Sequence, residues 1–520
     1  MPHITKLKLT NYKRFPSISL EFNESINTII GDNEAGKSSI LQAIELVAGG
    51  SRGKVETIGF ESLINKQCVE DFNAGERNYA NLPLVLAELF LSDSPKPELT
   101  GNHNTDKVDC AGLYMVIEPN EELTSEINDA LAAHPENFPY EYYVVRFYTF
   151  SGEAYAGYRR FLKCLSIDSS QINSEYANRE YIKTVYESTV SDPDRALLKN
   201  EYRLQKSRFK DTHFSHINKS IGVLDFALRS GSKYNLETDI TLAEDDIPID
   251  ERGKGHQCFI KTEFALTRNA GATKLDVLLL EEPENHLSHT NMKKLIHRVS
   301  ESHGNQIIIA THSSLISTRL DLKNATLLSN LSTHPLNLRE LSADTAKFFM
   351  KAPDNNALEF ILSKKVILVE GNAEFILLDV IYKQVTGRSL EEDSVHVISI
   401  GGISFKRYME LAEKLGIRCA VIRDNDKDYQ GNCVDNYKDY VTDTIRVFSD
   451  PDDSRYTLEV CIFQDNRDLC DQVFSGSKTK TPLEVMLASK AEGAFILAEQ
   501  HGDALTVPDY LQEAIRWINE

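Results

Sequence analysis

Four carboxylates in the C-terminal half of the sequence have the types and spacing of a chemical site. Glu370 and Glu374 form one pair, and Asp424 and Asp426 form a second pair about fifty residues later. Carboxylates gathered at one site repel each other, so such a site requires a cation. Their oxygen ligands suit Mg²⁺ or Mn²⁺. The two pairs together therefore indicate a divalent-metal site, whereas either pair alone is equally consistent with an acidic loop at a solvated edge.

Each pair follows a segment with the pattern of a fully buried strand. Residues 366–369 and 419–422 are continuous apolar runs, and 395–400 is a third apolar segment between them. Such runs are typical of strands in a parallel sheet covered on both faces. Helical patterns over 374–382 and 405–415 separate the three strands. Ligands of an open α/β sheet gather at the carboxyl ends of its strands, so we expect the four acids to converge there.

A phosphate-binding motif lies near the N-terminus. The sequence GDNEAGKS at 31–38 follows an apolar segment at 26–30 and precedes a helical pattern over 39–47, as G-x-x-x-x-G-K-S requires. Backbone N–H groups of such a loop hold phosphates, the lysine reaches the β- and γ-phosphates, and the serine hydroxyl binds Mg²⁺. The predicted nucleotide-binding residues of this motif are Gly31, Asn33, Gly36, Lys37, Ser38 and Ser39.

Composition limits the class of protein. A chain of 520 residues is too long for a single hydrophobic core, so we expect two to four domains. Its composition, with 41% hydrophobic and 26% charged residues, is typical of a globular protein. The eight cysteines form no C-x-x-C pair, and no run of about twenty apolar residues occurs. These features predict a soluble cytoplasmic protein without a membrane segment. The net charge of -21 argues against a general nucleic-acid coat, but not against a nuclease, because metal ions can bridge acids to phosphate.

Further elements are expected around the phosphate-binding motif. Residues 3–21 alternate as two strands around a turn, and strands over 82–91, 113–117 and 142–149 could complete an antiparallel sheet. The rest of 50–110 is predicted to be rich in loops.

Residues 165–235 change to a polar composition with helical patterns over 181–190 and 195–209, and 203–210 is locally basic. This segment is either a helical insertion with a solvated face or an arm for dimerisation or DNA contact.

A second set of motifs follows this insertion. Gly253 and Gly255 open a helix that runs to about residue 264, although a glycine pair alone could be a simple turn. An apolar strand at 277–280 ends in EEPENHL, and a strand at 306–309 ends in ATHS. With the phosphate-binding motif, this set resembles the ATP-binding-cassette head of SMC, RecF and Rad50 proteins.

That resemblance implies a role for each motif. Glu281 stands at the Walker B acid, Glu282 at the general base that activates water, and His312 at the switch histidine that senses the γ-phosphate. Gly253 and Gly255 stand at the signature, which would face the nucleotide of an opposite protomer and so implies a dimer. Glu281 replaces the usual Asp, and the signature is not LSGGQ, which leaves the hydrolysis rate in doubt more than binding.

The E-G-x-x-E and D-x-D pairs resemble a Toprim domain, and the whole chain resembles the OLD (overcoming lysogenization defect) family of ATPase-nucleases. That family includes the nuclease subunit of Gabija anti-phage systems and nucleases linked to some retrons. The resemblance implies two further site residues, Glu459 as a metal-site acid and Lys490 as a lysine near the scissile phosphate. Without it, Glu459 indicates only a strand-end acid and Lys490 a solvated helix lysine.

These patterns predict an α/β protein in which an ABC-type ATPase head with a helical insertion precedes a Toprim domain with a parallel sheet. The expected domains are residues 1–164 (P-loop half of the ATPase), 165–240 (insertion), 241–345 (signature, Walker B and switch) and 346–520 (Toprim). The expected function is an ATP-regulated, Mg²⁺- or Mn²⁺-dependent endonuclease acting on DNA in anti-phage defence. In its two-metal site, Glu374 could be a ligand or a general base.

The alternatives are a RecF- or SMC-like repair ATPase whose Toprim domain does not cut, and a retron-linked nuclease acting on RNA or another nucleic acid. The expected partners are DNA, a second copy of the chain or a higher homo-oligomer, and a helicase or reverse transcriptase.

Overall fold

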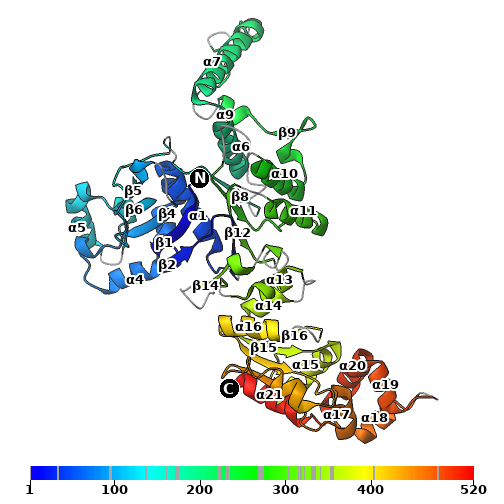
Figure 1. Cartoon of the computed structure of the whole chain (residues 1–520). Helices are drawn as coiled ribbons and strands as arrows, with labels where there is room; N and C mark the ends of the chain where they lie inside the picture. Colours follow the sequence, from blue (N-terminus) through cyan, green and yellow to red (C-terminus); the bar gives the residue numbers. More distant parts are fainter. Residues whose placement is uncertain are drawn as a thin grey trace. The chain divides into compact units, whose positions relative to one another are not determined.

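The computed structural model describes residues 2–520 except 32–33, 93–95, 135–136, 158, 160, 170–174, 220–223, 230, 232–234, 268–274, 302–303, 314–315, 317–318, 321, 329–334, 340, 352–355, 402–404 and 477–478. The chain forms two compact units. The first comprises residues 1–316 with 326–335, and the second comprises residues 317–325 with 336–520. Figure 1 shows the elements of each unit along the chain.

The first unit contains an antiparallel sheet with strand order β2-β1-β4-β6, in which β5 and β7 also pair with β6. Its strands are β1 (Ile4–Tyr12), β2 (Phe15–Glu21), β4 (Val85–Leu91), β5 (Thr100–Gly101), β6 (Cys110–Pro119) and β7 (Tyr143–Thr149). The alternation of buried and exposed residues along β2 matches a sheet with one face against the core. The antiparallel sheet expected from the sequence is confirmed.

A second sheet of the first unit carries the phosphate-binding motif. Its strands run in the order β13-β3-β12-β11-β8, and β3, β12, β11 and β8 are parallel. They are β3 (Ile26–Gly31), β8 (Cys164–Asp168), β11 (Val277–Glu281), β12 (Gln306–Thr311) and β13 (Ala325–Leu328). All six residues of β12 are buried, as expected for a central strand. The carboxyl ends of β3, β11 and β12 therefore lie at one edge of the sheet.

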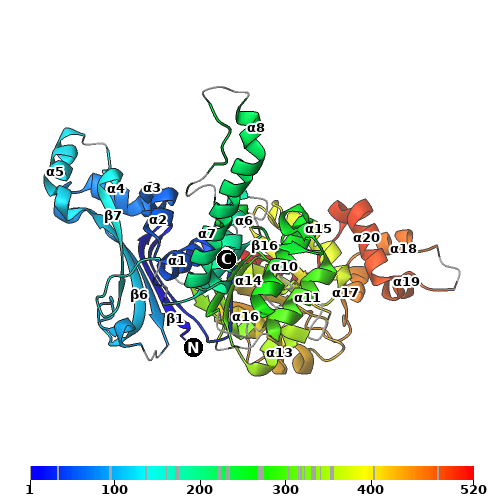
Figure 2. The same ribbon diagram turned by 90° about the horizontal axis from the view of Figure 1, so that it is seen from above.

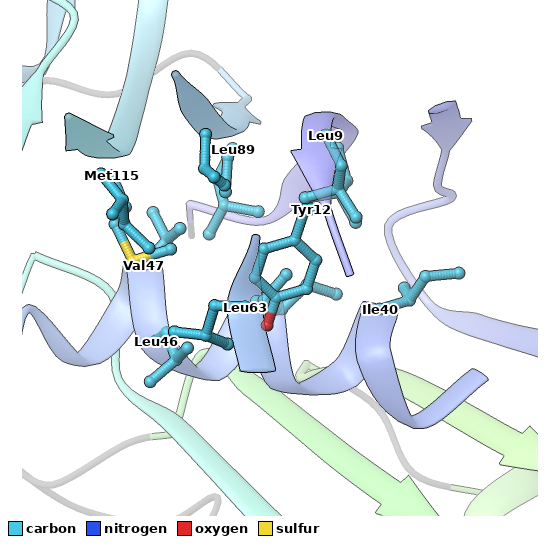
Figure 3. Packing of buried hydrophobic residues seen from close by; sticks show 14 of the residues in the cluster. Leu9, Tyr12, Ile40, Leu46, Val47, Leu63, Leu89 and Met115 are labelled. Atoms are coloured by element: carbon cyan, nitrogen blue, oxygen red, sulfur yellow. The ribbon is translucent and has the colours of Figure 1, made fainter. Parts of the chain in front are cut away.

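Helix α1 (Lys37–Gly49) packs against strands of both sheets, among them β4, β6, β8 and β12. Figure 3 shows Val47 of α1 beside Met115 of the antiparallel sheet, and Ile40 of α1 on the side of Leu9 and Tyr12. Burial of these side chains fixes the helix that follows the phosphate-binding loop, at about 1.5–3 kcal/mol for each large apolar side chain. The loop between β3 and α1 is thereby held at both ends.

Residues 50–110 contain more helix than the sequence suggested. Three short helices, α2 (Arg52–Ile58), α3 (Phe60–Leu63) and α4 (Lys66–Ala74), occupy a region that was expected to be rich in loops. They span too few turns to give a clear apolar period, and tertiary packing stabilises them instead. The usable signal was Asn65, whose side chain accepts a hydrogen bond from Cys68 N and caps α4. Figure 2 shows these helices beside α5 (Thr124–Ala133), at one end of the antiparallel sheet.

The polar insertion is helical, as expected. It contains α6 (Glu175–Thr189), α7 (Asp192–Phe209), η5 (Lys210–Phe214), α8 (Ser215–Asn218) and α9 (Leu236–Asp239). The role of this segment as an arm for dimerisation or DNA contact stays a prediction. The hairpin of β9 (Ala243–Glu244) and β10 (Ile247–Pro248) and the helices α10 (Lys254–Thr267) and α11 (His289–Ser300) complete the first unit.

The second unit is built on a parallel sheet of order β16-β15-β17-β18. Its strands are β15 (Lys365–Val369), β16 (Val395–Ser399), β17 (Arg418–Ile422) and β18 (Ile445–Phe448). The first three agree with the apolar runs of the sequence. The order reverses beside β15, so the carboxyl ends of β15 and β17 lie at a topological switch point.

Helices surround this sheet and extend beyond it. They are α13 (Ala343–Lys351), α14 (Ala357–Leu362), α15 (Asn372–Thr386), α16 (Phe405–Leu415), α17 (Leu458–Asp465), α18 (Arg467–Val473), α19 (Pro482–Ala488), α20 (Lys490–His501) and α21 (Asp509–Asn519). Helix α15 packs against both α20 and α21, and α21 packs against β17. None of the helices in the described part of the chain is both long and apolar enough to cross a membrane.

Candidate active sites

The phosphate-binding loop borders a cavity of about 520 Å³ in the first unit. Lys37, although charged, is buried, and its Nζ donates a hydrogen bond of 2.6 Å to the carbonyl oxygen of Gly31. The cavity is lined by Lys13, Arg14, Glu34, Ala35, Gly36, Lys37, Ser38, Ser39, Glu61, Ser62, Ile64, Asn65, Lys66 and Glu282. Asn33, predicted as a loop residue, lies outside the described residues. A cavity with four basic side chains in its lining, beside a helix N-terminus, has features of a polyphosphate site.

Gly36 is required by its conformation and by its neighbours. Its φ is +94°, and a Cβ there would lie 2.4 Å from Cζ of Phe15. We expect Gly36→Ala to reduce nucleotide affinity by about 5- to 150-fold, because strain of about 1–3 kcal/mol would distort the loop. Binding of a fluorescent ATP analogue measures the loss. Gly49→Ala in the same helix is the matched control, because a Cβ there meets nothing within 4 Å, and equal affinities of the two variants would contradict the prediction.

Glu281 ends β11 next to the phosphate-binding loop. Burial raises the pKa of its carboxyl group, and a hydrogen bond from Ser38 opposes that shift. Asp168 at the end of β8 pairs in register with Glu281, and its charge raises the same pKa. Ser38 and Glu281 are thus brought together as the Walker B assignment requires. Asp168 was missed, because β8 is a short strand whose place beside β11 is set by the fold.

Glu282 and His312 also meet. Nδ1 of His312 lies 3.3 Å from Oε1 of Glu282 and 3.5 Å from Oε1 of Glu284. Glu282 has a left-handed φ of 43°, which is unusual for a residue other than glycine and is found at functional sites. Its N–H donates to the carbonyl of Ala310 at 2.8 Å, which ties it to β12.

Glu284 is a site residue that the sequence analysis did not single out. It is buried, and its Oε1 accepts hydrogen bonds from the hydroxyl of Thr311 at 2.5 Å and from the N–H of His312 at 3.0 Å. It therefore holds the end of β12 against the turn that carries Glu282. The available signal was the third glutamate in EEPE.

The two predicted signature glycines lie at the start of α10. A Cβ on Gly255 would lie 2.2 Å from the carbonyl oxygen of His286, so only glycine fits there, whereas Gly253 has open space. Neither residue lines the cavity at the phosphate-binding loop. Within one chain the structure does not bring them to that loop, and their role toward a partner's nucleotide stays a prediction.

In the second unit, Glu374, Asp424, Glu459 and Lys490 form what we call the inner group. The three acids of this group are buried: Glu374 and Asp424 are each 8% exposed, and Glu459 is 5% exposed. Nζ of Lys490 lies 3.0 Å from Oε2 of Glu459 and 3.9 Å from Oδ2 of Asp424. Oδ1 of Asp424 accepts a hydrogen bond of 2.8 Å from the N–H of Leu458. Residues from four separate segments of the chain therefore lie near the end of β17.

Glu370, Asp426 and Arg423 form the outer group. Nε of Arg423 lies 3.4 Å from Oε1 of Glu370, and one terminal guanidinium nitrogen lies 3.8 Å from Oδ2 of Asp426. Asp426 is exposed and has a left-handed φ of 51°. The sequence analysis missed Arg423, because a lone arginine at a strand end carries no metal-site signal.

One of the two interpretations made without the family resemblance is wrong. Glu459 lies in the first turn of α17 rather than at a strand end, and Thr457 caps that helix. Lys490 begins α20 with a side chain that is 46% exposed, as expected of a solvated helix lysine, but it also pairs with Glu459. That pairing joins two different helices, so it leaves no local pattern in the sequence. The four strand-end acids and these two residues thus lie in one region of the second unit.

The acids of this region have perturbed proton affinities. Burial, with the charges of Glu374 and Glu370, raises the pKa of Asp424 to about 8. Burial raises the pKa of Glu370 to about 7 against the lowering effect of Arg423. Burial also raises the pKa of Glu374. The site therefore disfavours its own negative charge, which a bound cation would relieve.

These shifts predict a pH dependence of stability. The folded state favours the protonated acids, so the stabilisation present at low pH is lost as pH rises from about 4, the unfolded-state pKa, through the folded values of about 7 for Glu370 and about 8 for Asp424. We expect the melting temperature in EDTA to fall between pH 5 and 8 relative to that of a Glu370→Gln, Asp424→Asn variant. Parallel curves for the two proteins would refute this.

The donor set fits a divalent cation. Among the described residues, no three His, Cys, Asp or Glu side chains are gathered closely enough to hold a metal as they stand. Oε1 of Glu459 is nevertheless buried without a hydrogen-bond partner in the described part of the chain, whereas Oε2 lies 3.0 Å from Nζ of Lys490. Buried, unpartnered oxygens beside other acids are the ligands that Mg²⁺ and Mn²⁺ prefer. Small side-chain movements would be needed to close a coordination shell.

Comparison with known families covers the same two regions. The family described as AAA ATPase domain matches residues 3–226 and 197–316, which together make up more than half of the chain. The family described as overcoming lysogenization defect protein-like, TOPRIM domain matches residues 361–426, which contain Glu370, Glu374, Asp424 and Asp426. The chain belongs to the OLD family of ATPase–Toprim proteins. The predicted fold class, an α/β ATPase domain followed by a Toprim domain, is confirmed for this OLD family member.

Individual relatives of this OLD family chain match only parts of it. The Old nuclease of Escherichia phage P2 is 23% identical over 171 residues, which is 30% of this chain and 29% of that protein. The DNA replication and repair protein RecF of Flavobacterium johnsoniae is 28% identical over 136 residues, 26% of this chain and 31% of the relative. The chain thus matches less than a third of the length of either relative.

Solved structures show weaker likeness. The SMC head domain from Thermotoga maritima has a TM-score of 0.32 and 14% identity, covering 64% of this chain and 97% of its own. The C-terminal region of the Xanthomonas campestris pv. campestris OLD protein has a TM-score of 0.23 and 20% identity, covering 30% and 94%. At these scores neither likeness carries an argument about this chain.

Proposed function

We propose that the protein is an ATP-regulated, metal-dependent endonuclease that nicks or cleaves DNA. The observation that carries this proposal is that Lys490 lies beside Asp424 and Glu459 in the Toprim unit, with further acids of the inner and outer groups near the end of β17. The match of the Old nuclease of phage P2 supports the same reaction class. Its family further suggests a cytoplasmic role in anti-phage defence.

The side chains suggest how the work is divided. Glu370, Glu374, Asp424, Asp426 and Glu459 would hold Mg²⁺ or Mn²⁺, which when bound would activate water and neutralise phosphate charge. The Nζ of Lys490 would stabilise the charge that develops on the phosphate during attack. The hydrogen bond from Leu458 N would keep Asp424 oriented. Because Glu459 and Glu374 are buried, few water molecules can reach the carboxylates of the inner group.

The ATPase domain would act as a regulator. Lys37 and Ser38 would bind the phosphates and the nucleotide's Mg²⁺, while Glu281 and Glu282 would support hydrolysis. His312, held beside Glu282, would respond to the γ-phosphate. With Gly253 and Gly255 facing the nucleotide of a second protomer, ATP would set the geometry of a homodimer or larger homo-oligomer and so switch cleavage.

A second candidate is a repair ATPase whose Toprim domain does not cut. The similarity to RecF of Flavobacterium johnsoniae, described as a DNA replication and repair protein, favours it. Acids at all four core Toprim positions, with Lys490 beside Asp424, favour the nuclease. RNA or a retron product is an alternative substrate, and a helicase or a reverse transcriptase encoded nearby would be the corresponding partner.

Cleavage of supercoiled plasmid tests the proposal. Purified protein is incubated with Mg²⁺ or Mn²⁺, with and without ATP, beside a structured RNA. Nicked or linear DNA is expected from the native protein and not from the variant Asp424→Ala with Asp426→Ala. The ATP lanes give the sign of regulation.

The absence of cleavage would also distinguish the two candidate functions. A protein that binds ATP but leaves both nucleic acids intact, even with the product of a neighbouring gene, would overturn the nuclease proposal. It would support the repair ATPase. Cleavage of RNA alone would change the substrate and keep the reaction class.

A further inference from the structure

Each group of acids in the Toprim unit contains one basic side chain. Lys490 lies among the inner carboxylates, and Arg423 lies between Glu370 and Asp426. The family match covers Arg423 by position but gives it no role. A cation placed between two proposed metal ligands must affect how these ligands bind a metal.

Arg423 is held in place by its own contacts. Its N–H donates to the carbonyl of Phe448 at 3.1 Å, which fixes it to β18. Its guanidinium donates to the hydroxyl of Tyr437 and lies 5.5 Å from the centre of that ring. The side chain is only 15% exposed, and its buried Nε has no hydrogen-bond partner among the described residues. The arginine is therefore fixed beside Glu370 without a fully satisfied bond to it.

We propose that Arg423 is a positioning residue that competes with the metal ion for Glu370 and Asp426 and thereby sets the metal affinity of the outer group. This inference rests on the proposed metal-dependent function. The positive charge of Arg423 offsets the electrostatic repulsion between the two carboxylates and holds both near the end of β17. The same charge opposes a divalent cation at the same oxygens, so binding is weaker than the acids alone would give.

The sign of the effect separates this role from a structural one. Removing the charge while keeping most of the side-chain volume, as in Arg423→Gln, should tighten metal binding, since the competing cation is gone. It should also lower stability without metal, because Glu370 and Asp426 then repel each other. An arginine needed only for folding would lower stability and leave metal affinity unchanged or weaker.

Mn²⁺ binding to the full-length protein, measured by electron paramagnetic resonance without nucleotide, tests the proposal. Arg423→Gln is expected to bind Mn²⁺ about tenfold more tightly than the native protein, in the range of a partly buried ion pair. Arg423→Lys keeps the charge and should stay close to native affinity. Tyr437→Phe keeps the charge but removes the acceptor that holds the guanidinium, which can then bond Glu370 and Asp426 more fully. It should therefore weaken Mn²⁺ binding a few-fold, which keeps the test decisive if Arg423→Gln does not fold.

Arg455→Gln is the matched control. Arg455 pairs with Asp450 at 2.6 Å and with Asp465 at 2.7 Å in the same unit, so its loss should lower the melting temperature without changing Mn²⁺ affinity. Unchanged or weaker Mn²⁺ binding by Arg423→Gln, or tighter binding by Tyr437→Phe, would overturn the proposal. Because the readout is binding, a protein that never cleaves DNA still gives the answer. Failure of the nuclease proposal is seen separately, in the plasmid assay.

Discussion

Replacing Asp424 by Asn is expected to reduce DNA cleavage by roughly 10²–10³-fold while making the protein more stable at pH 8. The amide preserves the shape of the side chain and an acceptor for the N–H of Leu458, so the local backbone should be kept. It removes a carboxylate that is 8% exposed and whose pKa is raised to about 8. A loss of activity together with a gain in stability would indicate that the charge of Asp424 destabilises the fold but is needed for the reaction.

Two measurements on the same preparation check this expectation. Initial rates of plasmid nicking give the activity, and thermal unfolding in EDTA at pH 8 gives the stability. Asp468→Asn on α18 is the control, because Asp468 is exposed and lies in the same unit. Full nicking by Asp424→Asn would remove Asp424 from the site, and a lower melting temperature would mean that its charge is paired more favourably than we infer.

The second large effect concerns Glu282. We expect Glu282→Gln to slow ATP hydrolysis by roughly 10²–10⁴-fold with nucleotide affinity nearly unchanged, the range for loss of a general base. The side chain lies at the cavity and is oriented by Asn285, whose Nδ2 donates to Oε2 at 2.8 Å. Glutamine can accept the same hydrogen bond, and the left-handed φ of 43° strains its backbone no more than that of glutamate. Its side-chain amide, however, cannot accept a proton from water.

Phosphate release and binding of a fluorescent ATP analogue separate the two properties. Light scattering with ATP should show a persistent dimer of Glu282→Gln if nucleotide is bound between protomers. Glu301→Gln, at the exposed end of α11, serves as the control. Hydrolysis at the native rate would show that another group, such as Glu284, activates water.

Much of this site was predictable because its main residues end apolar strands. The runs at β15 and β17 are buried throughout, and a buried parallel strand leaves a continuous apolar signal that a sequence shows directly. β18 was missed because it is short, lies at the sheet edge and exposes Arg446. Because this strand was not predicted, neither was the hydrogen bond from the backbone N–H of Arg423 to the carbonyl of Phe448.

Residues that act through distant contacts were less predictable. Asp168 reaches Glu281 only because β8 pairs with β11 across more than a hundred residues. Glu284 supports His312 through a bond between two strand ends. Local periodicity carries no record of such pairings, whereas family resemblance supplied Glu459 and Lys490 in advance. The domain boundaries proposed from the sequence remain predictions.

The proposed nuclease site has a consequence for synthesis of the chain. Glu370 and Lys490 stand 120 positions apart, so at about 5–20 residues per second the ribosome adds the lysine roughly 6–24 s after the first acid. Until then the nascent protein carries the acids of the site without Lys490, the partner of Glu459. A polypeptide stalled before α20 is therefore expected to be harmless to the host's DNA, and translation itself delays the appearance of cutting activity.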